Sequence, residues 1–259
     1  MITVAMRDVS ILGCGWLGLP LAIHLLKNDF AVKGSTTSVE KIIVLKEEKI
    51  AAHLVDISKE SNKAIDQFLN SEVLIVAIPS KDVDGFKRFM PFIEQSAIKK
   101  VVFISSTSVY PSLNIIVTEE SETVNSPLVT IEKSFLENKN FKTTIIRFAG
   151  LMGEGRNPGN WFVGRKIPQP KGFVNMIHQD DCIGIIHQII KQDVFGEVFN
   201  ACSNHHPTRK EFYTNAKKLL KKEPPIFDDS LPLKYKIINA DKIQKRLNYI
   251  FKFDDLLAI

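Results

Sequence analysis

Cysteine is scarce in this sequence, where three cysteines, Cys14, Cys182 and Cys202, are spread over 259 residues. They form no CxxC pair that would bind a metal or exchange electrons, and their odd number and wide spacing are typical of reduced cytosolic thiols. Long apolar runs are also missing, because no stretch approaches the ~18 residues that cross a bilayer. The segment from Met1 to Ser10 leads into an apolar run that is too short and too weakly basic for a signal peptide. We therefore expect a soluble cytoplasmic protein with no metal site and no membrane partner.

Strong compositional bias is absent too. Hydrophobic residues make up 44% of the chain and charged residues 24%, with a formal net charge of +5. These values exclude disordered, collagen-like and disulfide-stapled proteins. The densest basic cluster consists of Lys217, Lys218, Lys221 and Lys222. It follows an apolar helical stripe from Phe212 to Leu220 and lacks interleaved arginine or aromatic residues, so we expect a solvated helix face and no nucleic-acid partner.

Short apolar runs alternate with segments of helical period along the first half of the chain. The expected strands span residues 9–12, 31–35, 53–55, 73–78, 101–105 and 144–148. Several are nearly continuous Val, Ile and Leu, which a sheet buried on both faces requires. The alternation predicts an α/β fold, a Rossmann-type doubly wound parallel sheet.

The second half of the chain has a different texture. Glycine and proline crowd residues 150–170, which predicts a long functional loop. A helix over 181–191 and a short strand over 197–200 follow, and Thr208 with Glu211 fits a helix capping box. We expect a nucleotide-binding domain over 1–150 and a smaller substrate lobe over 151–259, with the strand near 197–200 returning to the sheet.

The most informative segment is a G-x-G-x-x-G motif between an apolar strand and an amphipathic helix. In this motif Gly13 permits a tight turn, Gly15 lets the backbone approach a pyrophosphate, and Gly18 lets helix and strand pack closely. Trp16 and Leu17 lie at the start of the helix, where free amides and the helix dipole favour an anion. In this context the motif predicts dinucleotide binding.

The sequence favours NADP over NAD, with both left open. An NAD site usually carries an acid about 20 residues after the motif, at the end of the second strand. That stretch has no acid here, and instead offers hydroxyls from Ser35, Thr36 and Thr37 with Lys33 or Lys41 nearby. These groups suit a 2′-phosphate.

Three further segments make the family resemblance more specific than the glycines alone. They are Val101–Tyr110 with its Ser-Ser-x-x-Val-Tyr, Arg147–Gly153, and Ile177–Asp181. With them the chain resembles an atypical short-chain dehydrogenase/reductase, similar to the extended NAD-dependent epimerase/dehydratase family.

The resemblance implies a set of catalytic residues that is incomplete in this chain. Ser106 falls on the position that polarises the substrate oxygen, and Lys133 on the position that holds the nicotinamide ribose. The tyrosine position between them is Val129, which cannot transfer a proton. Proton movement would then need Tyr110, a loop residue or water.

Other positions complete the implied cofactor site. Asp56 matches the adenine-binding acid of the family, or else caps the following helix. Ile78 ends the fourth expected strand and Pro79 follows it, and we expect both to contact the cofactor. Asp180 and Asp181 are expected to cap the helix that starts there.

The substrate is expected at the glycine-rich loop, where Arg156 and Arg165 would clamp a phosphate or carboxylate and Trp161 would stack on a ring. Solvated charges and core packing are the alternatives for these residues. The resemblance implies a sugar nucleotide or another phosphorylated or carboxylated small molecule, and a homodimer. Two functions stay open: hydride exchange at a carbinol or carbonyl carbon, or a non-catalytic NAD(P)-binding redox sensor.

Overall fold

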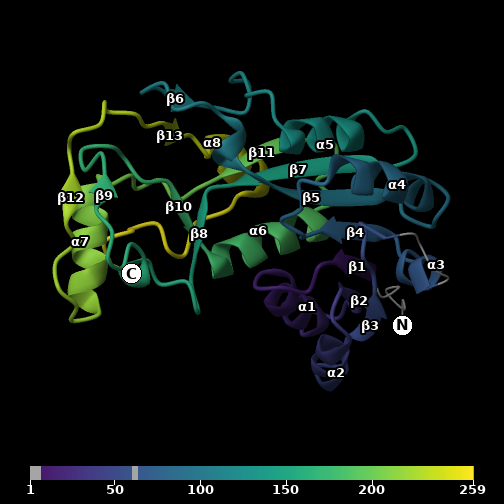
Figure 1. Ribbon diagram of the computed structural model, residues 1–259. Helices are drawn as coiled ribbons and strands as arrows, with labels where there is room; N and C mark the ends of the chain where they lie inside the picture. The colour runs from purple at the N-terminus through teal and green to yellow at the C-terminus, as the bar shows by residue number, and fades with distance from the viewer. Residues whose placement is uncertain (1–6, 60–63, 259) are drawn as a thin grey trace. The chain divides into compact units, whose positions relative to one another are not determined.

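The structure is a computed structural model that describes residues 7–59 and 64–258 (Figure 1). Residues 1–6 of the amino-terminal segment, for which no signal peptide was expected, lie outside the described residues. Backbone contacts group the chain into two compact units. The first unit comprises residues 1–105, 125–146 and 186–197, and the second comprises 106–124, 147–185 and 198–259. The chain thus passes back and forth between the two units.

A seven-stranded sheet has the order β11-β7-β5-β4-β1-β2-β3. Its strands are β1 (Asp8–Leu12), β2 (Ala31–Thr36), β3 (Ala51–Leu54), β4 (Val73–Val76), β5 (Lys100–Ser106), β7 (Lys142–Phe148) and β11 (Val198–Ala201). The pairs of β1 with β2 and β4, of β2 with β3, and of β4 with β5 are all parallel. All four residues of β4 are buried, because helices cover both faces of such a sheet. The predicted doubly wound α/β fold is confirmed.

The first unit supplies most of the helices that cover these strands. They are α1 (Gly18–Leu26), α2 (Val39–Glu47), α3 (Ala64–Phe68), α4 (Val83–Glu94) and α5 (Pro127–Leu136). Phe86 of α4, Phe103 of β5 and Phe135 of α5 form an aromatic cluster with ring centroids 5.0–6.0 Å apart. This cluster fixes α4 and α5 together on one face of β4 and β5 (Figure 1).

The second unit is built from short elements. Its parallel strand pairs are β6 (Ile116–Val117) with β13 (Ile237–Ile238), β8 (Gly150–Met152) with β10 (Met176–His178), and β9 (Ile167–Pro168) with β12 (Phe227–Asp228). It also holds α7 (Arg209–Leu219), α8 (Asp241–Leu247) and the start of α6 (Gln179–Lys191). Figure 1 shows α7 alongside β9 and β12.

The glycine-rich segment is more ordered than a long irregular loop. It contains β8, a 3-10 turn at Pro158–Asn160 and β9. Met152 and Ile167 from this segment share a small core with Phe212 and Tyr213 of α7, against which Trp161 packs. Burial of these apolar side chains fixes the segment where its local sequence shows no period.

Helix α7 begins with the predicted capping box, since Thr208 and Glu211 exchange both bonds. The expected arrangement of its lysines is wrong at one position. Lys217 is only 8% exposed, whereas Leu219 is 56% exposed. The buried residues of α7 are Phe212, Tyr213, Ala216 and Lys217. The aliphatic part of a lysine side chain can lie along apolar surface, which explains the burial of Lys217.

Candidate functional site

The glycine loop joins β1 to α1 so tightly that two of its glycines have no space for a side chain. A Cβ added at Gly13 would lie 2.4 Å from Cγ2 of Ile78, and Gly13 has a φ of +100°. A Cβ added at Gly18 would lie 2.1 Å from the carbonyl oxygen of Gly13. Both positions therefore require glycine, the first for backbone conformation and contact with Ile78, the second for close helix packing.

Gly15 has the opposite environment. Among the described residues other than its two chain neighbours, no heavy atom lies within 4 Å of a Cβ added there. The helix that follows starts at Gly18, and its N-cap residue Leu17 provides no side-chain cap. An open backbone approach before an uncapped, positively polarised helix end fits a pyrophosphate group. Trp16 beside it is half-buried, and Leu17 is buried.

The end of β2 holds this loop in place. The Gly13 amide donates to Oγ of Ser35 over 3.0 Å, and the Cys14 amide donates to the Ser35 carbonyl over 2.8 Å. Ser35 is almost fully buried. Oγ1 of Thr36 accepts from the Ser38 amide over 3.1 Å. Of the three hydroxyls expected near the cofactor ribose, those of Ser35 and Thr36 therefore already accept hydrogen bonds from backbone amides.

The two lysines near this strand differ. Nζ of Lys33 donates to the Asn70 carbonyl over 2.8 Å and to Oγ of Ser71 over 3.1 Å, so it is engaged with the segment before β4. Lys41 in α2 and Thr37 are exposed. Of the groups expected to hold a 2′-phosphate, Thr37 and Lys41 are the ones that stay accessible.

Asp56 makes local contacts in the turn that follows β3. Its carboxylate accepts from Oγ of Ser58 over 2.6 Å and from the Ser58 amide over 3.0 Å, and it pairs with Lys59 at 3.5 Å. The Ser58 hydroxyl is the main cause that lowers the pKa of Asp56. Asp56 caps a turn and also lines a cavity of about 380 Å³ together with Ile57 and Phe89. Pro79 is exposed after β4, whereas Ile78 packs against Gly13.

Ser106 ends β5 and is half-buried. Its Oγ accepts from the Ser108 amide over 3.1 Å and so caps the 3-10 turn Thr107–Val109. This bond uses an oxygen lone pair and leaves the hydroxyl hydrogen available to another acceptor.

Tyr110, four residues later, lies in a buried polar network. Its hydroxyl donates to Oδ1 of Asn200 over 2.9 Å and accepts from Nη1 of Arg147 over 2.7 Å. Tyr110 is 2% exposed, and burial raises its pKa. The Asn200 amide in turn donates to the carboxylate of Glu119 over 2.8 Å. A hydroxyl enclosed in this way does not fit the proton-transfer role considered for Tyr110.

Helix α5 carries the other expected catalytic positions. Val129 is 7% exposed, and Lys133 is exposed, with no hydrogen bond or ion pair from its ammonium group to any described residue. Sequence reasoning missed the neighbouring Glu132, which is 1% exposed and accepts from Oγ of Ser105 over 2.5 Å. Its spacing of three residues from both Val129 and Phe135, on the buried stripe, was the available signal.

Asp181 does not cap α6 as expected. Its carboxylate is fully buried and accepts from the amides of Lys252 over 2.8 Å and Phe253 over 3.1 Å, and from the Tyr249 hydroxyl over 3.0 Å. Burial, followed by the nearby Asp181 charge, raises the pKa of Tyr249. Three donors from the C-terminal segment thus replace the helix amides as partners of this acid, and Asp180 stays exposed.

The residues expected at the substrate lie in the second unit. Trp161 and Arg165 line an open cavity of about 540 Å³ together with Phe162 and Tyr213. The Arg165 guanidinium lies 5.7 Å from the centre of the Phe162 ring. Arg156 is exposed and is not among the residues that line this cavity.

Metal-ligand clusters and membrane-spanning helices are both absent from the described residues. No group of three or more His, Cys, Asp or Glu side chains among them is arranged to hold a metal ion. Across the same residues, no helix is both long and apolar enough to cross a membrane.

Known proteins resemble this chain in sequence and in fold. No protein-family model matches the chain. Protein YeeZ of Escherichia coli K12 is 31% identical over an alignment of 271 positions that covers 98% of this chain and 99% of YeeZ. UDP-glucuronic acid 4-epimerase from Bacillus cereus, a mutant solved with a UDP sugar derivative and NAD, is similar with a TM-score of 0.78, 18% identity and 97% coverage of each chain. A short-chain dehydrogenase/reductase superfamily protein from Agrobacterium tumefaciens with bound NAD has a TM-score of 0.79 and 14% identity, covering 97% of this chain and 95% of its own. These likenesses confirm the resemblance at the level of the fold.

Proposed function

The chain belongs to the family of Escherichia coli YeeZ, and from its fold and its glycine loop we propose that it binds a nicotinamide dinucleotide and exchanges hydride at a carbinol or carbonyl carbon. The observation that carries this proposal is the contrast among the three glycines. A Cβ at Gly13 or Gly18 would collide with protein atoms, whereas the space around a Cβ at Gly15 is open. A glycine turn kept for packing alone would not need the open position.

The chain's own residues supply positioning and polarisation. A bound nicotinamide would supply the hydride chemistry. Ser106 would donate its hydroxyl hydrogen to the substrate oxygen, because its lone pair is already held by the Ser108 amide. Lys133 would donate to the cofactor ribose. Because Tyr110 is enclosed by Arg147 and Asn200, the proton would come from water or from a loop residue.

We assign the cofactor as NADP rather than NAD. No carboxylate lies at the end of β2, and Thr37 and Lys41 are accessible there. Lys41→Ala should weaken NADPH binding by roughly tenfold, the size of one charge-assisted hydrogen bond of about 1.5 kcal/mol, and should leave NADH binding unchanged. NADH binding ten times tighter than NADPH to the unaltered protein would reverse the assignment.

The proposed substrate is a sugar nucleotide or another phosphorylated or carboxylated small molecule. The open cavity beside Trp161 and Arg165 offers an aromatic surface and a cation to such a ligand. The Bacillus cereus epimerase was solved with a UDP sugar derivative, which makes UDP sugars the first compounds to test. We also propose a cytoplasmic location, since all three cysteines are buried and free, and a homodimer.

A second candidate function is cofactor binding without turnover, in which the protein reports the NAD(P)H ratio to a partner. Val129 at the tyrosine position and the enclosed Tyr110 hydroxyl favour it, because no ionisable tyrosine is then placed for proton transfer.

Absorbance at the reduced-nicotinamide band separates the two functions. We expect turnover with NADP or NAD on a panel of sugar nucleotides and aldehydes, and loss of most of it in Ser106→Ala. Ser108→Ala is the matched control, because the Ser108 hydroxyl is exposed on the same turn and its backbone amide keeps the bond to Ser106. Cofactor binding without turnover across the panel would favour the sensor, and absence of cofactor binding would refute both functions.

A further inference from the structure

The second unit contains a cavity of about 210 Å³ between the glycine-rich segment, α7 and the C-terminal segment. Most of its walls are apolar, and they include Met152, Pro158, Phe212, Ala216 and Leu256. Four of these side chains are at most 7% exposed. We name this space the C-terminal cavity.

One polar ring reaches the wall of the C-terminal cavity in a fixed orientation. Nδ1 of His178 accepts from the Asp180 amide over 3.2 Å, so the neutral ring carries its proton on Nε2. The Phe253 ring stacks on His178 with centroids 3.8 Å apart and an angle of 29° between the planes. Nε2 makes no hydrogen bond to any described residue.

Gly153 keeps the Nε2 edge of this ring open. A Cβ at position 153 would lie 3.4 Å from Nε2 and 2.9 Å from Cβ of Gln179, and the φ of Gly153 is +145°. The other polar lining side chain, Asn157, is exposed, and its Oδ1 accepts from the Gly159 amide over 2.8 Å, which leaves its Nδ2 hydrogens as donors on the open side. His178, which the Asp180 amide and the Phe253 ring hold in place, is the donor with a fixed direction at the cavity wall.

We propose that the C-terminal cavity binds a neutral, ring-sized group whose carbonyl or hydroxyl oxygen accepts a hydrogen bond from Nε2 of His178. An apolar cavity of about 150 Å³ is large enough for benzene, so 210 Å³ accommodates one substituted six-membered ring. The apolar walls penalise a charged ligand. The oxygen gives the unpartnered donor its acceptor.

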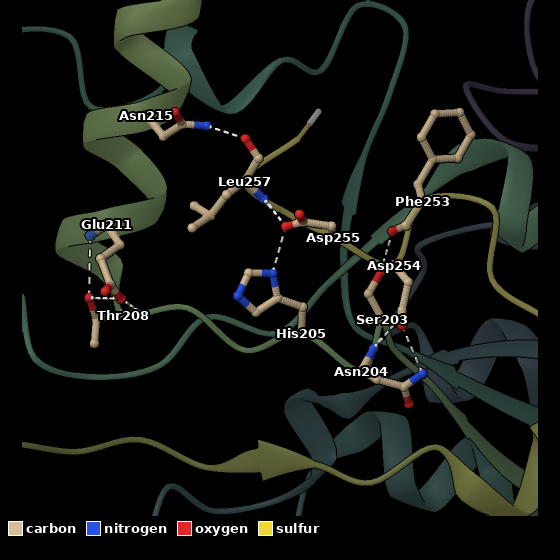
Figure 2. Close-up of polar contacts among 10 residues, drawn as sticks. All are labelled: Ser203, Asn204, His205, Thr208, Glu211, Asn215, Phe253, Asp254, Asp255 and Leu257. Carbon is tan, nitrogen blue, oxygen red and sulfur yellow. Dashed lines mark hydrogen bonds and ion pairs between the residues drawn. The ribbon is translucent and has the colours of Figure 1, made fainter.

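The wall formed by the C-terminal segment is held on both sides, so the site is preformed. Figure 2 shows Oγ of Ser203 donating to the Phe253 carbonyl over 3.0 Å and Nδ2 of Asn215 donating to the Leu257 carbonyl over 2.6 Å. Between them, Nδ1 of His205 lies 2.8 Å from the carboxylate of Asp255. These contacts fix Phe253 against His178 and Leu256 against the cavity.

The test uses two small probes, 4-fluorophenol and fluorobenzene, observed by ¹⁹F NMR with the full chain. Both rings should bind, and the phenol should bind about 3- to 10-fold more tightly, the ratio of one neutral hydrogen bond. His178→Phe retains the aromatic stack and should abolish the difference between the probes. Ala216→Met should fill the cavity and weaken both by about tenfold or more, whereas Thr214→Met on the exposed face of α7 should change neither.

The proposal fails if neither probe binds at millimolar concentration, or if a cooperatively folded Ala216→Met binds both as the unaltered protein does. It also fails if His178→Phe keeps the preference for the phenol. Should Ala216→Met not fold, Leu219→Trp tests the same point, because Leu219 is 56% exposed and lines the cavity. None of these outcomes depends on cofactor binding, so the proposed function can fail or hold separately.

Discussion

The Arg147 guanidinium donates a 2.7 Å hydrogen bond to the Tyr110 hydroxyl and lies over the ring of the same residue, 5.1 Å from its centre. Both side chains are buried, at 7% and 2% exposure. The pair therefore joins a cation to a neutral tyrosine inside the second unit. With the Asn200 side chain, the pair engages the Tyr110 hydroxyl both as a donor and as an acceptor.

Tyr110→Phe should destabilise the protein without lowering turnover. The ring stays, but Arg147 and Asn200 each lose a buried partner, which costs about 1–3 kcal/mol. Urea denaturation measures the change as a lower midpoint at constant slope. Tyr235→Phe is the control, since Tyr235 is only half-buried. A Tyr110→Phe protein of normal stability that has lost turnover would return Tyr110 to catalysis.

The glycines of the loop should separate binding from folding. Gly15→Ala meets no atom within 4 Å, so stability should change little, while cofactor affinity should fall by roughly tenfold, or about 1.4 kcal/mol. Gly18→Ala meets the Gly13 carbonyl at 2.1 Å and should lower the free energy of unfolding by about 3 kcal/mol. Thermal melts and fluorescence titrations measure the two effects. Equal loss of stability in both variants would contradict this division.

Asp181→Asn should release the C-terminal segment. An amide has one acceptor oxygen, so it cannot receive the Lys252 and Phe253 amides and the Tyr249 hydroxyl together. We expect faster hydrogen exchange at the two amides and a loss of about 1–3 kcal/mol. Asp180→Asn, at an exposed site, should leave exchange there unchanged. Unaltered exchange in Asp181→Asn would show that other contacts suffice.

Acid should destabilise the first unit through a histidine pair. Nε2 of His24 on α1 lies 2.9 Å from Nδ1 of His187 on α6. Burial, then His24, then Lys191 lower the pKa of His187 below its ordinary value of 6.5. The unfolded chain therefore binds the proton first, and the free energy of unfolding should fall as pH drops through 6.5 towards the folded pKa.

Unfolding measured between pH 8 and pH 5 in the unaltered protein and in His187→Gln checks this effect. The variant should show a shallower loss of stability on acidification. Part of the slope should remain, because burial also lowers the pKa of His206 in the second unit. An identical slope in both proteins would show that the pair does not control the response.

The sequence by itself determined the strand and helix order, the glycine turn and the Thr208 capping box. Each of these depends on residues a few positions apart or on the periodicity of apolar residues. Both can be recognised in the sequence alone. The need for glycine at positions 13 and 18 followed from the motif. The resemblance also pointed to Ser106, whereas its bond to the Ser108 amide comes from the structure.

Only the tertiary structure decided which polar groups are already engaged. The Tyr110 hydroxyl bonds to Asn200, 90 residues later in the chain. Asp181 accepts from the amides of Lys252 and Phe253, 71 and 72 residues later. Lys33 donates to Asn70 and Ser71, 37 and 38 residues later. No local pattern reports such partners, because burial and hydrogen bonding between distant segments arise when the chain folds. For the same reason, only the structure shows that the space around Gly15 is open while Gly13 and Gly18 are tightly packed. It also shows that Nε2 of His178 makes no hydrogen bond to a described residue.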